Sequence, residues 1–356
     1  MSAQNRPGPP TLTAHLNKMN PHTTPLKFLS PAWFAMVMGL CGLALAWHRA
    51  APVMGEMAGA GALVVGALAA LVAVALAGFS LLRWQRYPAQ PAEDLRHPVR
   101  HPMVAAMPVS LILLATVATA LTGPSLLARA LWVVGCTWQF GVTVWVLARW
   151  LKPGEGLAWP SATPLLIIPV VGNVLAPLAG VNLGFANWSA AQFGIGLLLW
   201  PVALVLLAVR IGLQGMWPER LLASTFITIA PPSVIGVAAL QLGAPTLLAW
   251  MAWGVALLFL AWSLTVFRRV ISQPFSIAFW ALSFPLASFS ALTLRLSTDV
   301  GGAFQALAMV ALAFSSLVIV ALALATGKGL REGTLLAPEP VAMINPSSSG
   351  TGASTS

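Results

Sequence analysis

The sequence predicts an all-α integral membrane protein of ten transmembrane helices arranged as five hairpins. Three observations lead to this fold class. Apolar residues make up 58% of the chain and charged residues only 7%, whereas a soluble domain carries about 25% charged residues. The 18 Lys and Arg and the 8 Asp and Glu residues all lie outside ten apolar segments, and the prolines inside these segments are concentrated in alternate ones.

Ten uncharged stretches have the length of a membrane span. About 20 apolar residues are needed for a helix to cross roughly 30 Å of hydrocarbon. The stretches are continuously apolar and rich in Leu and Ala, so they lack the alternation of a membrane β-barrel strand. The predicted helices cover residues 30–48, 57–82, 103–121, 130–148, 163–181, 189–209, 221–242, 246–267, 275–294 and 303–326.

The basic residues predict the orientation of these spans. Ten crossings place both chain ends on one side, and all Lys and Arg residues except Arg49, Arg129 and Arg295 then fall on that side. Because basic loops remain in the cytoplasm, both termini are predicted to be cytoplasmic. The net charge of +10 therefore indicates membrane topology and not nucleic-acid binding.

The predicted domains are a disordered cytoplasmic tail at residues 1–29, a ten-helix transmembrane domain at 30–327 and a second disordered cytoplasmic tail at 328–356. The first tail is rich in Pro and the second in Ser, Gly and Pro, and neither has an apolar core. Cys41 and Cys136 fall in separate spans as small apolar side chains. The sequence therefore predicts no disulfide, metal site or cofactor.

Proline separates the spans into two kinds, since among the even-numbered spans only the sixth contains one, Pro201. A proline inside a helix removes a backbone hydrogen bond and bends the helix. In a membrane the freed carbonyls need protein neighbours or a water-filled cavity. The odd-numbered spans are therefore predicted to be inner helices around a central pore, although any single proline is equally explained as a packing kink. The predicted kinks are Pro108, Pro169, Pro177, Pro231, Pro232 and Pro285.

The predicted spans contain no Asp, Glu, Lys or Arg. Pumps driven by ion gradients need an ionisable group within the membrane, and an ATP-driven protein needs a phosphate-binding loop that this sequence lacks. These observations favour a passive conduit. An uncharged pore passes anions where positive helix-dipole ends face it, with a pore for neutral solutes as the alternative. No convergent His, Cys or carboxylate set indicates an enzyme, so no catalytic residue is assigned.

Three segments resemble one family. They are FITIAPPSVIG at 226–236, VVGN at 170–173 and FSIAFWALSFPL at 275–286. Together with ten spans and five proline-bearing odd helices, they are similar to the tellurite-resistance/dicarboxylate transporter (TDT) family. This family includes bacterial TehA and the plant guard-cell slow anion channels.

The resemblance implies a quasi-fivefold ring of hairpins, a pore through each protomer and a homotrimer. It also implies that a phenylalanine of the ninth helix, here Phe284, closes the pore. Phe284 directly precedes Pro285, so a kink there would aim the ring across the lumen. The plant channels carry long phosphorylated tails, and the short N-terminal tail here resembles a bacterial member.

The resulting hypothesis is a passive channel of the bacterial inner membrane for small chloride-like or nitrate-like anions, gated by Phe284. The alternative is a carrier or exporter of sulfite, C4-dicarboxylates, tellurite-type oxyanions or toxic compounds. The predicted partners are small inorganic or organic anions and the lipid bilayer. Polar side chains inside the odd-numbered spans are candidates for lining the pore. An amide at such a position is equally explained by a hydrogen bond between helices, and a hydroxyl by a hydrogen bond to the backbone of its own helix. Candidate pore-lining residues are Asn173, Thr228, Ser233, Ser276, Ser283 and Ser288.

Overall fold

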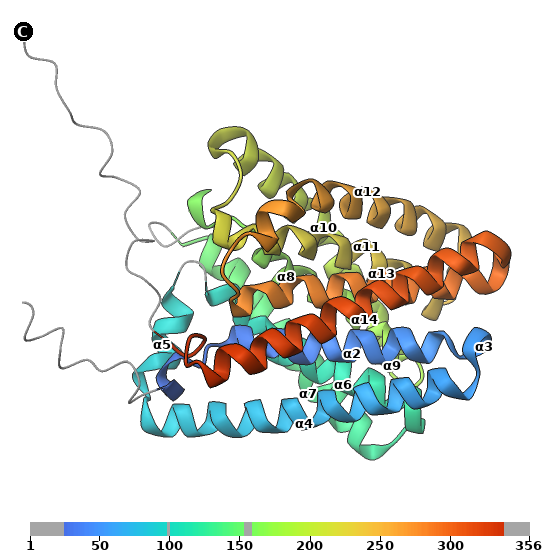
Figure 1. Ribbon diagram of the computed structural model, residues 1–356, viewed down its shortest axis with the longest axis horizontal. Coiled ribbons are helices and arrows are strands. Elements are labelled where there is room, and N and C mark those ends of the chain that lie inside the picture. Colours follow the sequence, from blue (N-terminus) through green and yellow to red (C-terminus); the bar gives the residue numbers. More distant parts are fainter. Residues whose placement is uncertain (1–24, 98–99, 153–158, 338–356) are drawn as a thin grey trace, which may run out of the picture.

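The computed structural model describes residues 25–97, 100–152 and 159–337, and every regular element in these ranges is an α-helix or a 3-10 helix. The long helices run roughly parallel to one another, and both ends of the described chain lie at the same end of the bundle (Figure 1). We call this the proximal end and the opposite one the distal end. Most of both predicted tails lies outside the described residues.

Five helices are long and continuous, and they correspond to the even-numbered predicted spans. Each has 25 residues or more, which at 1.5 Å per residue exceeds the roughly 30 Å of a hydrocarbon core. They extend past the predicted ends because Lys and Arg continue the helix while their long side chains reach the interface. These outer helices are α4 (Glu56–Arg86), α7 (Leu126–Trp150), α10 (Ala186–Gln214), α12 (Thr246–Ile271) and α14 (Gly302–Arg331).

Four inner helices alternate with them, and each is preceded by a 3-10 segment. The inner helices are buried over 61–89% of their most apolar window, compared with 17–39% for the outer helices. This difference confirms the predicted division into inner and outer helices. The inner helices are α2 (Ala35–Arg49), α6 (Ala106–Thr122), α11 (Ala230–Gln241) and α13 (Ser283–Val300), after 3-10 segments Pro31–Phe34, His101–Ala105, Glu219–Ile229 and Ile277–Leu282.

The fifth inner segment departs from the prediction of one continuous helix over 163–181. It consists of a 3-10 turn (Pro164–Leu166), α8 (Ile167–Val171), a second 3-10 turn (Gly172–Leu175) and α9 (Pro177–Gly180). Proline lacks a backbone N–H, so in one continuous helix Pro169 and Pro177 would leave two hydrogen bonds unmade within nine residues. Nine helices in the described chain are thus long enough to span a membrane, and this interrupted segment takes the place of the tenth.

The polar side chains of α7 satisfy carbonyls of this interrupted segment. Gln139 Nε2 lies 3.0 Å from the Pro169 carbonyl oxygen, and Thr143 Oγ1 donates to the same oxygen at 2.7 Å. Trp132 Nε1 donates to the Ala176 carbonyl at 2.9 Å. Because lipid offers no hydrogen bonds, these contacts allow an irregular backbone to persist inside the bundle.

The six predicted kink prolines all lie within the first three residues of an α-helix. There the missing N–H costs little, because the first turn has no intrahelical acceptor to use it. In α6, α11 and α13 the proline follows directly on the change from 3-10 to α-helix. The one proline deep inside a described α-helix is Pro201 of the outer helix α10.

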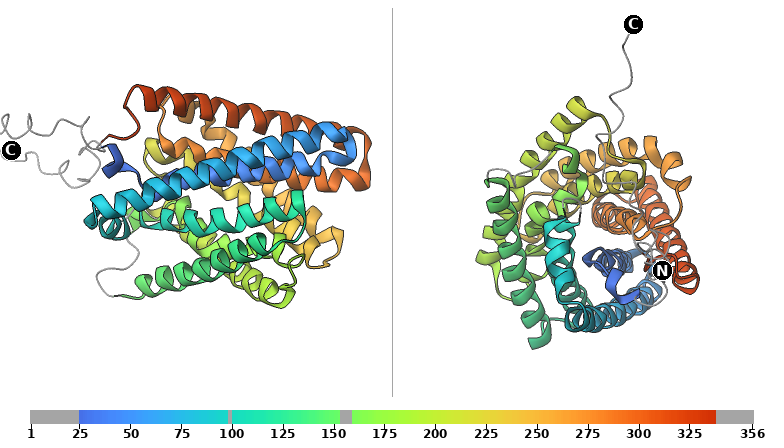
Figure 2. Two further views of the ribbon diagram at one scale, coloured as in Figure 1. Left: turned by 90° about the horizontal axis from the view of Figure 1, so that it is seen from below. Right: turned by 90° about the vertical axis from the view of Figure 1, so that its left-hand side faces the viewer.

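The inner segments contact one another in cyclic order. α2 packs against α6, α6 against α9, α9 against α11, α11 against α13, and α13 against α2 again. Each outer helix packs mainly on the inner segment before it, and α4, α7 and α14 lie at the rim in the view along the long axis (Figure 2). The quasi-fivefold symmetry of this arrangement stays a prediction.

Several carboxylates outside the predicted spans lie in helices, namely Glu56, Glu93, Asp94 and Asp299, and among these Asp94 is buried. Asp94 is in a short unpredicted helix, α5 (Ala89–Arg96), and its side chain is 1% exposed. Its oxygens accept from Arg83 Nη1 at 2.7 Å and from Arg100 Nη1 at 3.1 Å. This buried ion pair ties the proximal end of α4 to the loop before α6.

Candidate pore

Two cavities lie along the axis of the inner helices. The proximal cavity has a volume of about 190 Å³ and is lined by residues of all five inner segments. The distal cavity is smaller, about 40 Å³, and lies between α2, α6, α9, α11 and α13. Together they follow the line along which a pore was predicted.

Two residues of the described chain, Phe284 and Val234, line both cavities. Phe284 is the second residue of α13 and is 8% exposed. Its ring lies against Gly42 of α2, where a β-carbon would come within 2.9 Å of the ring Cδ2 atom. The ring therefore lies where the linings of the two cavities meet.

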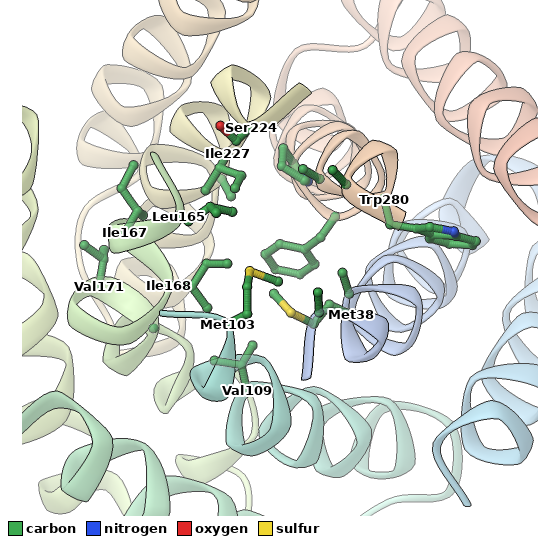
Figure 3. A pocket seen from close by; sticks show the side chains of 18 of the residues that line it. Met38, Met103, Val109, Leu165, Ile167, Ile168, Val171, Ser224, Ile227 and Trp280 are labelled. Atoms are coloured by element: carbon green, nitrogen blue, oxygen red, sulfur yellow. The ribbon is translucent and has the colours of Figure 1, made fainter. Parts of the chain in front are cut away.

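Apolar side chains line most of the proximal cavity. The side chains of Met38, Met103, Ile168 and Ile227 point into one central space (Figure 3). Trp280 points away from it, and its indole Nε1 donates to Thr326 of α14 at 2.9 Å. An apolar lumen raises the free energy of a hydrated ion, because it offers no groups to replace lost water.

The distal cavity contains polar groups beside Phe284. They are Arg49 of α2 and three hydroxyls, Thr116, Ser233 and Ser288. Each hydroxyl donates to a backbone carbonyl three or four residues earlier in its own inner segment, at 2.8, 2.7 and 2.9 Å respectively. In this arrangement the hydroxyl hydrogens are occupied, and among the described residues of this lining Arg49 is the group whose N–H donors have no acceptor in the protein.

The structure divides the predicted pore-lining residues. Ser233 and Ser288 line the distal cavity. Asn173, Thr228, Ser276 and Ser283 line neither cavity.

Local bonds explain most of these positions. Asn173 Nδ2 donates to Thr143 of the outer helix α7 at 2.8 Å, the bond between helices that was the alternative reading. Thr228 donates to the Thr225 carbonyl at 2.8 Å, and Ser283 faces Gly39 of α2. Of the six prolines, Pro231 and Pro285 line the proximal cavity.

Sequence reasoning missed Arg49 as a cavity residue because it lies at the end of the first predicted span. The signal was its spacing from Gly42 and Leu45, which are seven and four residues earlier and also line the distal cavity. Residues at such spacings share one face of a helix. The apolar lining by Met38, Met103 and Ile168 carried no signal that separates it from ordinary core packing.

These features define a class. A multi-pass helical membrane protein whose inner helices surround a partitioned axial cavity is a channel or transporter. The family model described as SLAC1, voltage-dependent anion channel, matches residues 29–327, and the chain belongs to this family. The resemblance carried by residues 226–236, 170–173 and 275–286 is thereby confirmed, and the family consists of anion channels and transporters.

Individual relatives are similar over different lengths. The S-type anion channel SLAH2 of Arabidopsis thaliana is 27% identical over 234 residues, 64% of this chain, and the chain spans 44% of that protein. The tellurite resistance protein TehA homolog of Haemophilus influenzae is 24% identical over 332 residues, covering 90% of this chain and 97% of the relative. The chain thus corresponds to nearly the whole bacterial relative but to less than half of the plant one.

Proposed function

We propose that this protein is a passive channel for small inorganic anions, closed in this structure by the ring of Phe284. The observation that supports this most directly is that Phe284 lines both the proximal and the distal cavity. Displacement of a single side chain would then join the two cavities into one path. Opening needs no movement of the long outer helices, because they line neither cavity.

The lining of the path supports passive flow. Among the residues that the structure describes, no Asp or Glu lines either cavity, and these are the groups that ion-coupled pumps use as proton relays or counter-ions. The buried carboxylate of Asp94 is paired with Arg83 and Arg100, and all three residues lie between the second and third predicted spans. An apolar path with cationic groups near its ends favours anions over cations. Arg49 lines the distal cavity and Arg100 the proximal one.

The orientation follows from charge. In the described chain the distal end has Arg49, Arg129 and Arg295, and the remaining Lys and Arg residues lie toward the proximal end. By the positive-inside rule we place the proximal end in the cytoplasm of a bacterial inner membrane. The resemblance to the family adds a homotrimer with one conduit in each protomer.

A carrier or exporter of oxyanions is the second candidate. The name of the Haemophilus influenzae relative refers to tellurite resistance, and that relative covers 90% of this chain. A carrier must expose its site alternately to the two sides. The separation of the proximal and distal cavities by Phe284 is also the geometry of such an occluded state.

Flux from proteoliposomes separates the two candidates. Vesicles loaded with chloride are diluted into an impermeant-anion buffer, and chloride efflux is followed for wild type, Phe284→Ala and Phe289→Ala. Phe289 is the matched control, because it is a buried ring of the same helix that packs on Trp253 and lines neither cavity. A channel gives faster efflux for Phe284→Ala alone, linear in chloride concentration. Saturable efflux that Phe284→Ala leaves unchanged would favour the carrier.

A further inference from the structure

The distal cavity is lined by a cationic side chain, that of Arg49, which has no part in the proposed closure of the path by Phe284. Arg49 is the last residue of α2 and lines this cavity together with Gly42 and Leu45 on the same helix face. Gly42 touches the Phe284 ring, and Arg49 lies seven residues, about 10 Å of helical rise, beyond it. Because side chains lean toward the N-terminus of their helix, the Arg49 side chain leans back toward Phe284.

The charge of Arg49 is not neutralised by a neighbouring carboxylate. Within the part of the chain that the structure describes, no ion pair involves Arg49. Arg295 lies close enough for its like charge to repel that of Arg49. Arg295 itself has a partner, since its Nη1 lies 3.4 Å from Asp299 Oδ1. An unpaired guanidinium in a partly enclosed space is stabilised by a mobile counter-ion.

The other polar groups of the cavity do not compete for that counter-ion. Thr116, Ser233 and Ser288 direct their hydroxyl hydrogens to backbone carbonyls. They present oxygen lone pairs to the cavity, which repel an anion. The guanidinium, with five N–H donors in a planar fork, is the anion-binding group in this lining.

The volume limits the size of the ion. A water molecule needs at least about 10–15 Å³ of such space, so the 40 Å³ of the distal cavity hold a few waters or one small anion. Chloride or nitrate fits within this space. A C4-dicarboxylate, which has several times more atoms than chloride, is too large for this volume.

We infer that Arg49 and the distal cavity form a resting site for one small inorganic anion, held on the distal side of the Phe284 ring. The site rests on the proposed function for its physiological use, since it would supply the next permeant ion when the ring moves. Its existence requires no conduction. It assigns to Arg49 the role of raising the local anion concentration at the distal mouth.

Binding is tested first, on the purified full-length protein in detergent at low ionic strength. Sodium chloride replaces sodium gluconate at constant ionic strength, and the thermal unfolding midpoint is measured for wild type, Arg49→Gln, Arg49→Lys and Arg129→Gln. A ligand that binds only the folded state raises this midpoint. Arg129 is the matched control, an exposed basic residue at the same end on the outer helix α7.

The inference requires a chloride-dependent rise for wild type and Arg129→Gln, its loss in Arg49→Gln and at least partial retention in Arg49→Lys. Equal chloride-dependent rises in wild type and Arg49→Gln would overturn it. The chloride comparison is made within each variant, so a variant that is merely less stable does not imitate the result.

Conduction is tested second, in a Phe284→Ala background. At low salt, removing the charge with Arg49→Gln is expected to reduce anion current driven from the distal side by about threefold or more, and 1 M salt should abolish the difference by screening. An unchanged distal-side current would contradict the role in supply. If the binding result holds while Phe284→Ala passes no current, the anion site stands and the proposed channel fails.

Discussion

Phe284 and Gly42 are in direct contact: a β-carbon on residue 42 would lie 2.9 Å from the Cδ2 atom of the Phe284 ring. Because Gly42 has no side chain, α2 leaves room at this position for the Phe284 ring. In this position the ring, together with Val234, lines both cavities. The position of the ring is thus set by two helices that are far apart in sequence.

Replacing Gly42 is expected to open the pore while Phe284 is present. In Gly42→Ala the added methyl group overlaps the ring, so the closed position is destabilised by about 1–3 kcal/mol, as for other overpacked sites. Chloride efflux from proteoliposomes should rise above wild type. Gly59→Ala on the outer helix α4 is the control, because no atom lies within 4 Å of its added β-carbon.

The two substitutions should not be additive. If Gly42 acts only by seating the ring, then Gly42→Ala adds nothing once Phe284 is alanine. Efflux for Gly42→Ala/Phe284→Ala should equal that of Phe284→Ala. A further increase in the double variant would mean that Gly42 affects the path independently of Phe284.

The buried charges at the proximal end should contribute to stability. Asp94→Asn removes the negative charge that lies 2.7 Å from the guanidinium of Arg83, whose side chain is 7% exposed. Removing one partner of a buried ion pair costs about 3–5 kcal/mol, and the thermal midpoint in detergent should fall clearly. The exposed pair of Arg269 and Glu219 provides the comparison. Glu219→Gln should lower the free energy of unfolding by no more than about 1 kcal/mol. Equal losses of stability in Asp94→Asn and Glu219→Gln would contradict the stabilising role of the buried ion pair.

Two glycines of α10 should differ sharply in their tolerance of alanine. A β-carbon at Gly196 would lie 2.6 Å from a methyl group of Val174 and 2.9 Å from its backbone nitrogen, whereas one at Gly194 meets no atom within 4 Å. Gly196→Ala is expected to cost about 1–3 kcal/mol through overpacking. Gly194→Ala should be neutral or slightly stabilising. Thermal midpoints of the two variants test this directly, and equal midpoints would show that the interrupted inner segment is not packed against α10 as described.

Asn173 is expected to affect stability and leave permeation unchanged. Its amide donates to Thr143 at 2.8 Å and does not line either cavity. Asn173→Ala removes one buried hydrogen bond, a loss of about 1 kcal/mol. Unitary conductance of Asn173→Ala/Phe284→Ala should match that of Phe284→Ala, and a lower value would place the amide in the path.

The sequence was sufficient for the class of fold and for the division between inner and outer helices. Both follow from one-dimensional patterns, the charge-free spans and the placement of residues such as Pro108, Pro231 and Pro285 in alternate ones. The interruption of the fifth inner segment was harder to predict. It depends on Gln139, Thr143 and Trp132 of α7, which supply hydrogen bonds from another helix.

The cavity lining was predicted less completely for a related reason. The sequence does not distinguish a serine that faces a cavity, such as Ser288, from one that faces a neighbouring helix, such as Ser283. The rotation of a largely buried helix has no hydropathy signal, since both of its faces are apolar. Arg49 was overlooked because a basic residue at the end of a span is usually an interfacial anchor.

Closure of an anion pore by Phe284 is tested most directly by single-channel recording of the full-length protein in planar bilayers, comparing wild type, Phe284→Ala and the control Phe289→Ala. Discrete anion-selective openings are expected for Phe284→Ala under conditions in which wild type and Phe289→Ala are almost always closed. Absence of unitary currents in Phe284→Ala, with the variant folded and inserted, would contradict the claim that this ring closes an anion pore.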